Sequence, residues 1–188
     1  FESTEVKVHW TDKYGGWVRR TFTSRPDNVA VQWLTAPEEQ SVNVRITVSE
    51  RGGGRGFGGG LNTAGVRSRG GTGAGSDESG NTMKDFNEQQ LIIKGRLDPS
   101  MDNRGFANVT RVVRNGGSAS MDGDTLMIEK ASSVMLLTRI EYLPDYSEDK
   151  VEAVRKSLEE LTPDYPALLE RARKVQSEML NRVTVDFG

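Results

Sequence analysis

The stretch Ser133-Val-Met-Leu-Leu-Thr-Arg-Ile-Glu-Tyr-Leu-Pro-Asp-Tyr146 decides the fold, because it joins two kinds of structure. Its apolar first half is typical of a buried strand, and Pro144-Asp145 ends that strand. Two segments with helical periodicity follow at once, and the sequence closes on Asn181-Arg-Val-Thr-Val-Asp-Phe-Gly188. Two helices between a β-rich body and a new apolar strand are typical of a connector, so we expect them to join this body to a further domain.

Short strand-like segments dominate residues 1–142. The clearest is 42–48, where Val42, Val44, Ile46 and Val48 alternate with polar residues, a period that buries one face and leaves the other in solvent. Similar segments, separated by turn residues, are 6–10, 17–23, 29–34, 91–97, 107–114, 125–130 and 134–142. This series predicts a mainly β fold, an antiparallel β-sandwich, rather than alternating strands and helices.

The two C-terminal segments predict amphipathic helices. Ser147 is placed to cap the first helix, and Thr162-Pro163 is placed to end it and to begin the second, with Thr162 as the cap. Isolated helices of this length are marginal, so both need a surface to pack on. Their apolar stripes are Val151, Val154, Leu158 and Leu161 in the first helix and Leu168, Ala172, Val175 and Met179 in the second.

These patterns divide the chain into three parts. We expect a β-sandwich domain over residues 1–146, two linker helices over 147–181, and the start of a strand over 182–188. Residues 51–80 hold a dense run of glycines that cannot bury enough apolar surface to order itself, so we expect a long mobile surface loop there.

Composition excludes several classes of function. The 188 residues carry a formal net charge of −2, so no global basic field attracts nucleic acid, and they contain no cysteine for disulfide or thiolate chemistry. No apolar run approaches the roughly 20 residues that a membrane helix needs. We expect no cofactor, no metal and no membrane partner, and a periplasmic or extracellular location.

Motifs that bind phosphate or nucleic acid are weak here. Gly54-Arg-Gly-Phe-Gly-Gly59 formally fits the dinucleotide pattern, but more glycine follows it where a helix should begin. Arg51-Gly-Gly53, Arg55-Gly-Phe57 and Arg69-Gly-Gly71 resemble an RNA-binding arginine–glycine segment. An RNA-associated protein that acts through this loop stays open as an alternative function.

Catalytic chemistry also finds few candidates. His9 is the only histidine, and it lies in an alternating strand where packed or outward-facing histidines are far more common. The run Asp98–Asn103 lacks a regular calcium-loop pattern, so turn chemistry is the better interpretation. No spacing singles out a pair of carboxylates for glycoside hydrolysis. Trp10, Trp17 and Trp33 are the candidates for contact with carbohydrate, although strand patterns surround all three and predict that one or two of them lie in the core.

Three ordered segments resemble one known family. These are Val6-Lys-Val-His-Trp10 with Trp17–Val31, then Asn115–Ile128 with Ser133–Thr138, and finally Asp164–Leu169 with Leu180–Gly188. They are similar to the N-terminal β-domain and helical linker of glycoside hydrolase family 95, the α-L-fucosidases and related α-L-galactosidases. Their order and spacing agree over nearly the whole chain, the Gly-rich insert excepted.

The resemblance implies a fold and a role. It implies a galactose-mutarotase-like β-supersandwich, joined by the helices to a C-terminal (α/α)6 barrel that carries the catalytic residues and acts on α-L-fucosyl or related glycans. The chain would then brace that barrel and hold no catalytic residue itself. A free-standing carbohydrate-binding or adhesion module is the other alternative.

Overall fold

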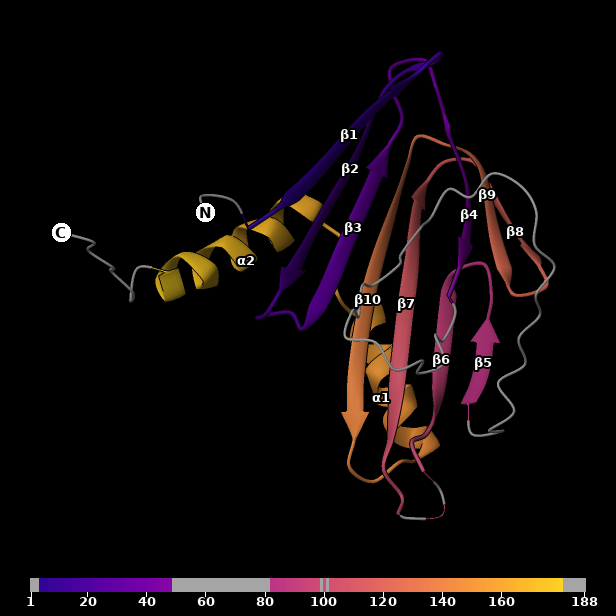
Figure 1. Ribbon diagram of the computed structural model, residues 1–188, viewed down its shortest axis with the longest axis vertical. Helices are drawn as coiled ribbons and strands as arrows, with labels where there is room; N and C mark the ends of the chain where they lie inside the picture. Colours follow the sequence, from indigo (N-terminus) through magenta and orange to yellow (C-terminus); the bar gives the residue numbers. More distant parts are fainter. Residues whose placement is uncertain (1–3, 49–81, 99, 101, 181–188) are drawn as a thin grey trace, which may run out of the picture.

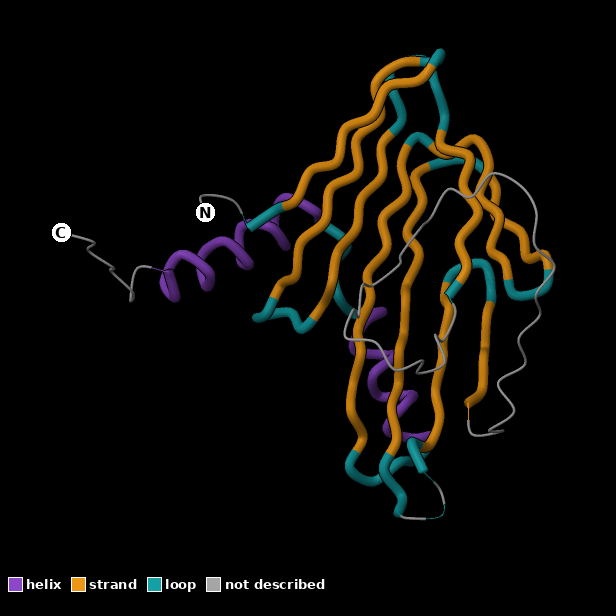
Figure 2. The backbone as a smooth tube through the Cα atoms, in the orientation of Figure 1, coloured by secondary structure: helices purple, strands orange, loops and turns teal. Residues whose placement is uncertain are grey.

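A computed structural model describes residues 4–48, 82–98, 100 and 102–180 as ten strands and two helices (Figures 1 and 2). The predicted Gly-rich loop at 51–80, with its arginine–glycine repeats, and the predicted strand start at 182–188 lie outside the described residues. Every strand pairing is antiparallel, which confirms the predicted fold class.

The larger sheet has seven strands in the order β1-β2-β3-β10-β7-β6-β5. Its centre is the pair β10 and β7, which stays in register over all eleven residues of each strand. The strands are β1 (Val6–Asp12), β2 (Gly15–Ser24), β3 (Val29–Thr35), β5 (Thr82–Phe86), β6 (Gln90–Arg96), β7 (Gly105–Asn115) and β10 (Ser133–Leu143).

The smaller sheet has three strands in the order β4-β9-β8. They are β4 (Val42–Thr47), β8 (Ser118–Asp122) and β9 (Thr125–Ala131). The sequence patterns did not predict β5 or β8. Both lie at sheet edges and bury almost no side chains, so neither shows the alternation of apolar residues that marks a half-buried strand.

The central strands of the larger sheet lie between the smaller sheet and the helices, so they are covered on both faces. Alternate residues of β10 separate the two cores: Met135 and Leu137 face the helices, while Val134 and Leu136 face the smaller sheet. Successive side chains of a strand point to opposite faces, and both faces of β10 are buried. This explains the continuous apolar run that the sequence shows at 134–137.

The helices α1 (Glu148–Glu159) and α2 (Tyr165–Leu180) pack on the other face of the larger sheet (Figure 1). Ser147 caps α1 as predicted. The predicted cap of α2 was wrong: Asp164, not Thr162, accepts the backbone N–H of Ala167 at 3.0 Å. The carboxylate two residues later reaches the free amides of the first turn, so the helix begins at Tyr165. Within the described residues, neither helix combines the length and apolarity that crossing a bilayer requires.

Candidate functional site

The hairpin of β1 and β2 brings two of the three candidate tryptophans together. Trp10 and Trp17 are direct cross-strand partners, and their rings stack with centroids 6.1 Å apart and planes inclined by 8°. The hairpin turns at Lys13 and Tyr14, and β2 begins at Gly15, where φ is +129° and an added Cβ would lie 3.0 Å from Pro37 Cβ. Only glycine suits both demands, so this turn fixes the register that pairs the two rings.

One ring of the pair is open to solvent. Trp17 packs against the core under the smaller sheet, whereas Trp10 is 38% exposed. β1 pairs only with β2 among the described strands, so the side of Trp10 away from Trp17 lies at the sheet edge. A tryptophan ring that is held by a stacked neighbour and reaches solvent offers a flat apolar face to a ligand, so Trp10 is a candidate binding position.

Polar and aromatic groups of the turn surround this ring. Asp12 lies two residues beyond Trp10, on the same face of β1. Its Oδ1 accepts the Tyr14 backbone N–H at 2.8 Å, and this bond is the main reason that the pKa of the Asp12 carboxyl lies below its usual range. Tyr14 is 55% exposed at the tip of the hairpin, and Lys13 Nζ lies 4.7 Å from its ring centroid. The end of the hairpin therefore combines an open ring with a carboxylate that stays ionised.

The third tryptophan lies elsewhere. Trp33 faces the helices, on the opposite side of the sheet from Trp17, and packs against Tyr165 with ring centroids 4.6 Å apart. The Arg20 guanidinium lies 5.5 Å from its centroid. His9 is exposed on β1 opposite Val18, and among the described residues no cluster of His, Cys, Asp or Glu could hold a metal ion.

The described residues of the run 98–103 make contacts typical of a turn. Asp98 Oδ1 accepts the Ser100 backbone N–H at 3.0 Å, and Asp102 pairs with Arg104 at 2.5 Å. These are local contacts within the loop, as turn chemistry predicts.

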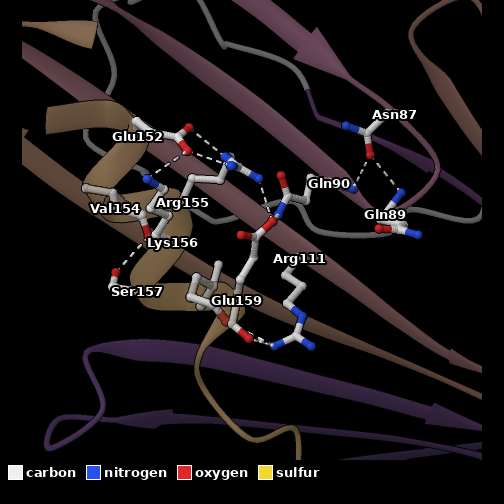
Figure 3. A network of polar contacts seen from close by, with 11 residues as sticks. Asn87, Gln89, Gln90, Arg111, Glu152, Val154, Arg155, Lys156, Ser157 and Glu159 are labelled. Atoms are coloured by element: carbon white, nitrogen blue, oxygen red, sulfur yellow. Dashed lines mark hydrogen bonds and ion pairs between the residues drawn. The ribbon is translucent and has the colours of Figure 1, made fainter. Parts of the chain in front are cut away.

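A polar network that the sequence did not reveal holds α1 on the sheet (Figure 3). Arg111 of β7 donates through Nη1 to the carbonyl oxygens of Leu158, Glu159 and Leu161 at 3.1, 2.9 and 2.8 Å. Gln90 Nε2 donates to Glu159 Oε1 at 2.7 Å. The last turn of a helix has no intrahelical donors for its carbonyls, and here a guanidinium from the sheet supplies them.

A second anchor holds the start of α2. The Tyr165 hydroxyl donates to Glu5 Oε1 at 2.5 Å, and its ring packs edge-on against Phe22 at 5.2 Å. The Glu5 side chain is only 1% exposed, with Lys7 Nζ 3.4 Å from its Oε2. Burial and the Glu5 carboxylate together raise the pKa of Tyr165 above its usual range. This side chain joins the N-terminal strand to the second helix.

The outer half of α2 leaves a pocket. It has a volume of about 510 Å³, and it lies between the last turns of α2 and the near ends of β1 and β2. Its lining is mainly apolar and includes Val6, Phe22, Ala172, Val175 and Met179. The size is that of a ligand pocket or of a seat for part of another domain.

Strands and helices in this order define a β-sandwich domain with a C-terminal helical pair. A family model described as "Glycosyl hydrolase family 65, N-terminal domain" matches residues 1–143. The chain therefore belongs to this family and is the non-catalytic N-terminal domain of a glycoside hydrolase-family protein.

Known structures agree on the fold. A protein named as a kojibiose phosphorylase, from the human microbiome, matches with a TM-score of 0.56 at 10% sequence identity. The match covers 92% of this chain but only 23% of that protein, so the chain spans about a quarter of its length. At this identity the likeness shows the fold and not the activity. A search of the curated proteins found no match.

Proposed function

We propose that this domain braces the catalytic (α/α)6 barrel of a longer polypeptide that hydrolyses α-L-fucosyl or related glycosidic bonds in the periplasm or outside the cell. Family membership supports a glycoside hydrolase parent, and the three segments similar to family 95 support the fucosyl substrate. The domain itself supplies no catalytic group in this proposal.

One observation carries the bracing role. The first half of α2 is fixed to the sheet through Tyr165, Leu168 and Ala172, while Val175 and Met179 in its second half remain partly open beside the apolar pocket. A helix whose first half is packed on this domain, and whose second half leaves apolar side chains partly exposed, is suited to join this domain to a second one.

The bracing role can be tested with charged substitutions on the outer half of α2. Val175→Lys in the parent polypeptide should lower its unfolding temperature and its α-L-fucosidase activity together, because the charge would be buried against the barrel. The same substitution in the 188-residue chain should have a small effect. Ser177→Lys is the matched control, since Ser177 is exposed and does not line the pocket. Equal effects of the two substitutions in the parent would refute the brace.

Substrate and role can fail separately. Release of L-fucose from 2′-fucosyllactose by the parent, with none from the 188-residue chain, is the expected result. If the parent instead converts kojibiose in the presence of phosphate, the fucosyl proposal is wrong and the bracing proposal stands. Turnover by the 188-residue chain alone, with contaminating enzymes excluded, would contradict both.

The two alternative functions make different demands. A free-standing carbohydrate-binding module must bind glycans without any catalytic domain, and the stacked pair Trp10 and Trp17 is the observation that favours it. An RNA-associated protein would depend on residues 51–80, which lie outside the described part of the chain.

A further inference from the structure

We propose that the open side of the Trp10 ring binds a pyranose ring of a glycan. The inference depends on the proposed function only for the class of ligand, because a glycoside hydrolase parent brings this surface into contact with glycans. The site consists of Trp10, Trp17, Asp12 and the free edge of β1.

The stacked pair fixes the binding surface in advance. Trp17 is held by the core under the smaller sheet, and it holds the Trp10 ring parallel at 6.1 Å. An aromatic ring that is already immobilised loses little side-chain entropy when a ligand stacks on it. The axial C–H groups of a pyranose form a flat, weakly polar face that matches such a ring, whereas an anionic ligand has no such face to offer.

Hydrogen-bonding groups lie near the ring, Asp12 towards Trp17 and the backbone groups of β1 along its free edge. Asp12 lies one strand repeat away, about 7 Å along β1, and its depressed pKa keeps it ionised as an acceptor for sugar hydroxyls. The free edge of β1 also presents backbone N–H and C=O groups that no described strand pairs. A hydroxyl-rich ring can use both kinds of group, which an apolar ligand cannot.

Peptide docking on the same edge is the rival interpretation, and the surface argues against it. The seven residues of β1 are all exposed. The apolar side chains on one face of this strand are Val6, Val8 and Trp10, and the other face carries Lys7 and His9. Strand addition normally draws its specificity from a row of pockets for alternate side chains, and the pocket at the start of β1 is lined by Val6 but by no later residue of that strand.

The test is a titration of the 188-residue chain with 2′-fucosyllactose and, separately, with kojibiose, followed through the three tryptophan indole N–H signals. We expect the Trp10 signal to shift with a Kd of about 1–10 mM for at least one sugar, while the Trp33 signal stays still. Trp10→Leu should weaken binding at least tenfold. Asp12→Asn, which keeps an acceptor for the Tyr14 amide and so preserves the turn, should weaken it about threefold.

Tyr142→Ala is the matched control, because Tyr142 is 53% exposed on β10, away from the hairpin. It should leave the Kd unchanged. Two results would overturn the site: no shift of the Trp10 signal with either sugar at about 50 mM, or a Kd that Trp10→Leu leaves unaltered. Neither result bears on parental fucosidase activity, which is measured on the longer polypeptide, so the two proposals fail independently.

Discussion

The helices α1 and α2 begin alike and end differently. Each starts beside a buried tyrosine whose hydroxyl donates to a glutamate: Tyr146 to Glu148 at 2.7 Å, and Tyr165 to Glu5 at 2.5 Å. The far end of α1 is then capped by Arg111 over the centre of the sheet, whereas α2 runs out beyond the side of the sheet formed by β1, β2 and β3 (Figure 1). This difference indicates that α1 packs along its whole length on this domain, whereas the outer half of α2 is free to pack on a further domain.

The test of this contrast with the largest expected effect compares one apolar residue from each helix. Leu158 of α1 is fully buried, so Leu158→Ala should cost about 2–5 kcal/mol through lost burial and a residual cavity. Met179 of α2 is 42% exposed, and Met179→Ala should cost less than about 0.5 kcal/mol. Urea unfolding followed by circular dichroism measures both. Similar losses for the two variants would remove the distinction between the helices.

The next test concerns the cap that only α1 has. Arg111→Met keeps the apolar stem but leaves three carbonyl oxygens without their donor, so we expect a loss of about 1–3 kcal/mol in the free energy of unfolding. Arg155→Met is the control, because Arg155 makes only partly exposed ion pairs with Glu152 and Glu159, each worth about 0–1 kcal/mol. If Arg155→Met proves as costly as Arg111→Met, the guanidinium cap is not what holds α1.

The two tyrosine anchors differ in how deeply their acceptors are buried. Tyr165→Phe removes the hydrogen bond to a carboxylate that is 1% exposed, and we expect a loss of about 1–3 kcal/mol. Tyr146→Phe should cost less, because the Glu148 side chain is 59% exposed and water replaces the lost donor. Thermal unfolding of both variants at pH 7 ranks them, and the opposite ranking would contradict the anchor at α2.

Tyr146 also makes stability depend on alkaline pH. Burial, and then the bond to Glu148, raise the pKa of Tyr146 from 10 to about 12 in the folded chain. Its contribution is therefore complete below pH 10 and is lost as the pH rises towards 12. A shift of this size corresponds to roughly 1–3 kcal/mol. The unsubstituted chain should have a higher urea midpoint than Tyr146→Phe at pH 8, and this difference should shrink above pH 11. The comparison isolates this tyrosine from lysines that titrate in the same range, because both chains contain the same lysines.

The sequence alone predicted most of this fold because burial leaves a regular trace. Val42, Val44 and Ile46 alternate, and Val151, Val154 and Leu158 repeat at helical spacing, so the element types followed. The edge strands β5 and β8 left no such trace, since almost nothing in them is buried. The apolar run at 134–137 of β10 predicted a strand. It did not predict that successive residues of this strand contribute to two separate cores.

The site was less accessible to sequence for a different reason. Whether Trp10 stacks on Trp17 depends on the register of the hairpin, and whether Trp33 joins them depends on which face of β2 and β3 is covered. Arg111 shows the same limit, because a cap supplied from a distant strand has no local signature. The pairing of Glu5 with Tyr165, 160 residues apart, is likewise a product of packing.

The smallest expected effects concern the two N-caps. Asp164 Oδ1 accepts the Ala167 amide at 3.0 Å, whereas Ser147 Oγ lies 3.4 Å from the Lys150 amide, near the limit of a hydrogen bond. Asp164→Ala should therefore cost about 1 kcal/mol, and Ser147→Ala nearer 0.5 kcal/mol. The far end of α2 makes an exposed contact to a weak acceptor, from Arg25 Nη1 to Met179 Sδ at 3.0 Å, so the loss of Asp164 should also speed hydrogen exchange along the helix from Tyr165 onward. The capped far end of α1 should keep its exchange slow in Ser147→Ala, and equal acceleration in both helices would mean that the Arg111 cap does not protect α1.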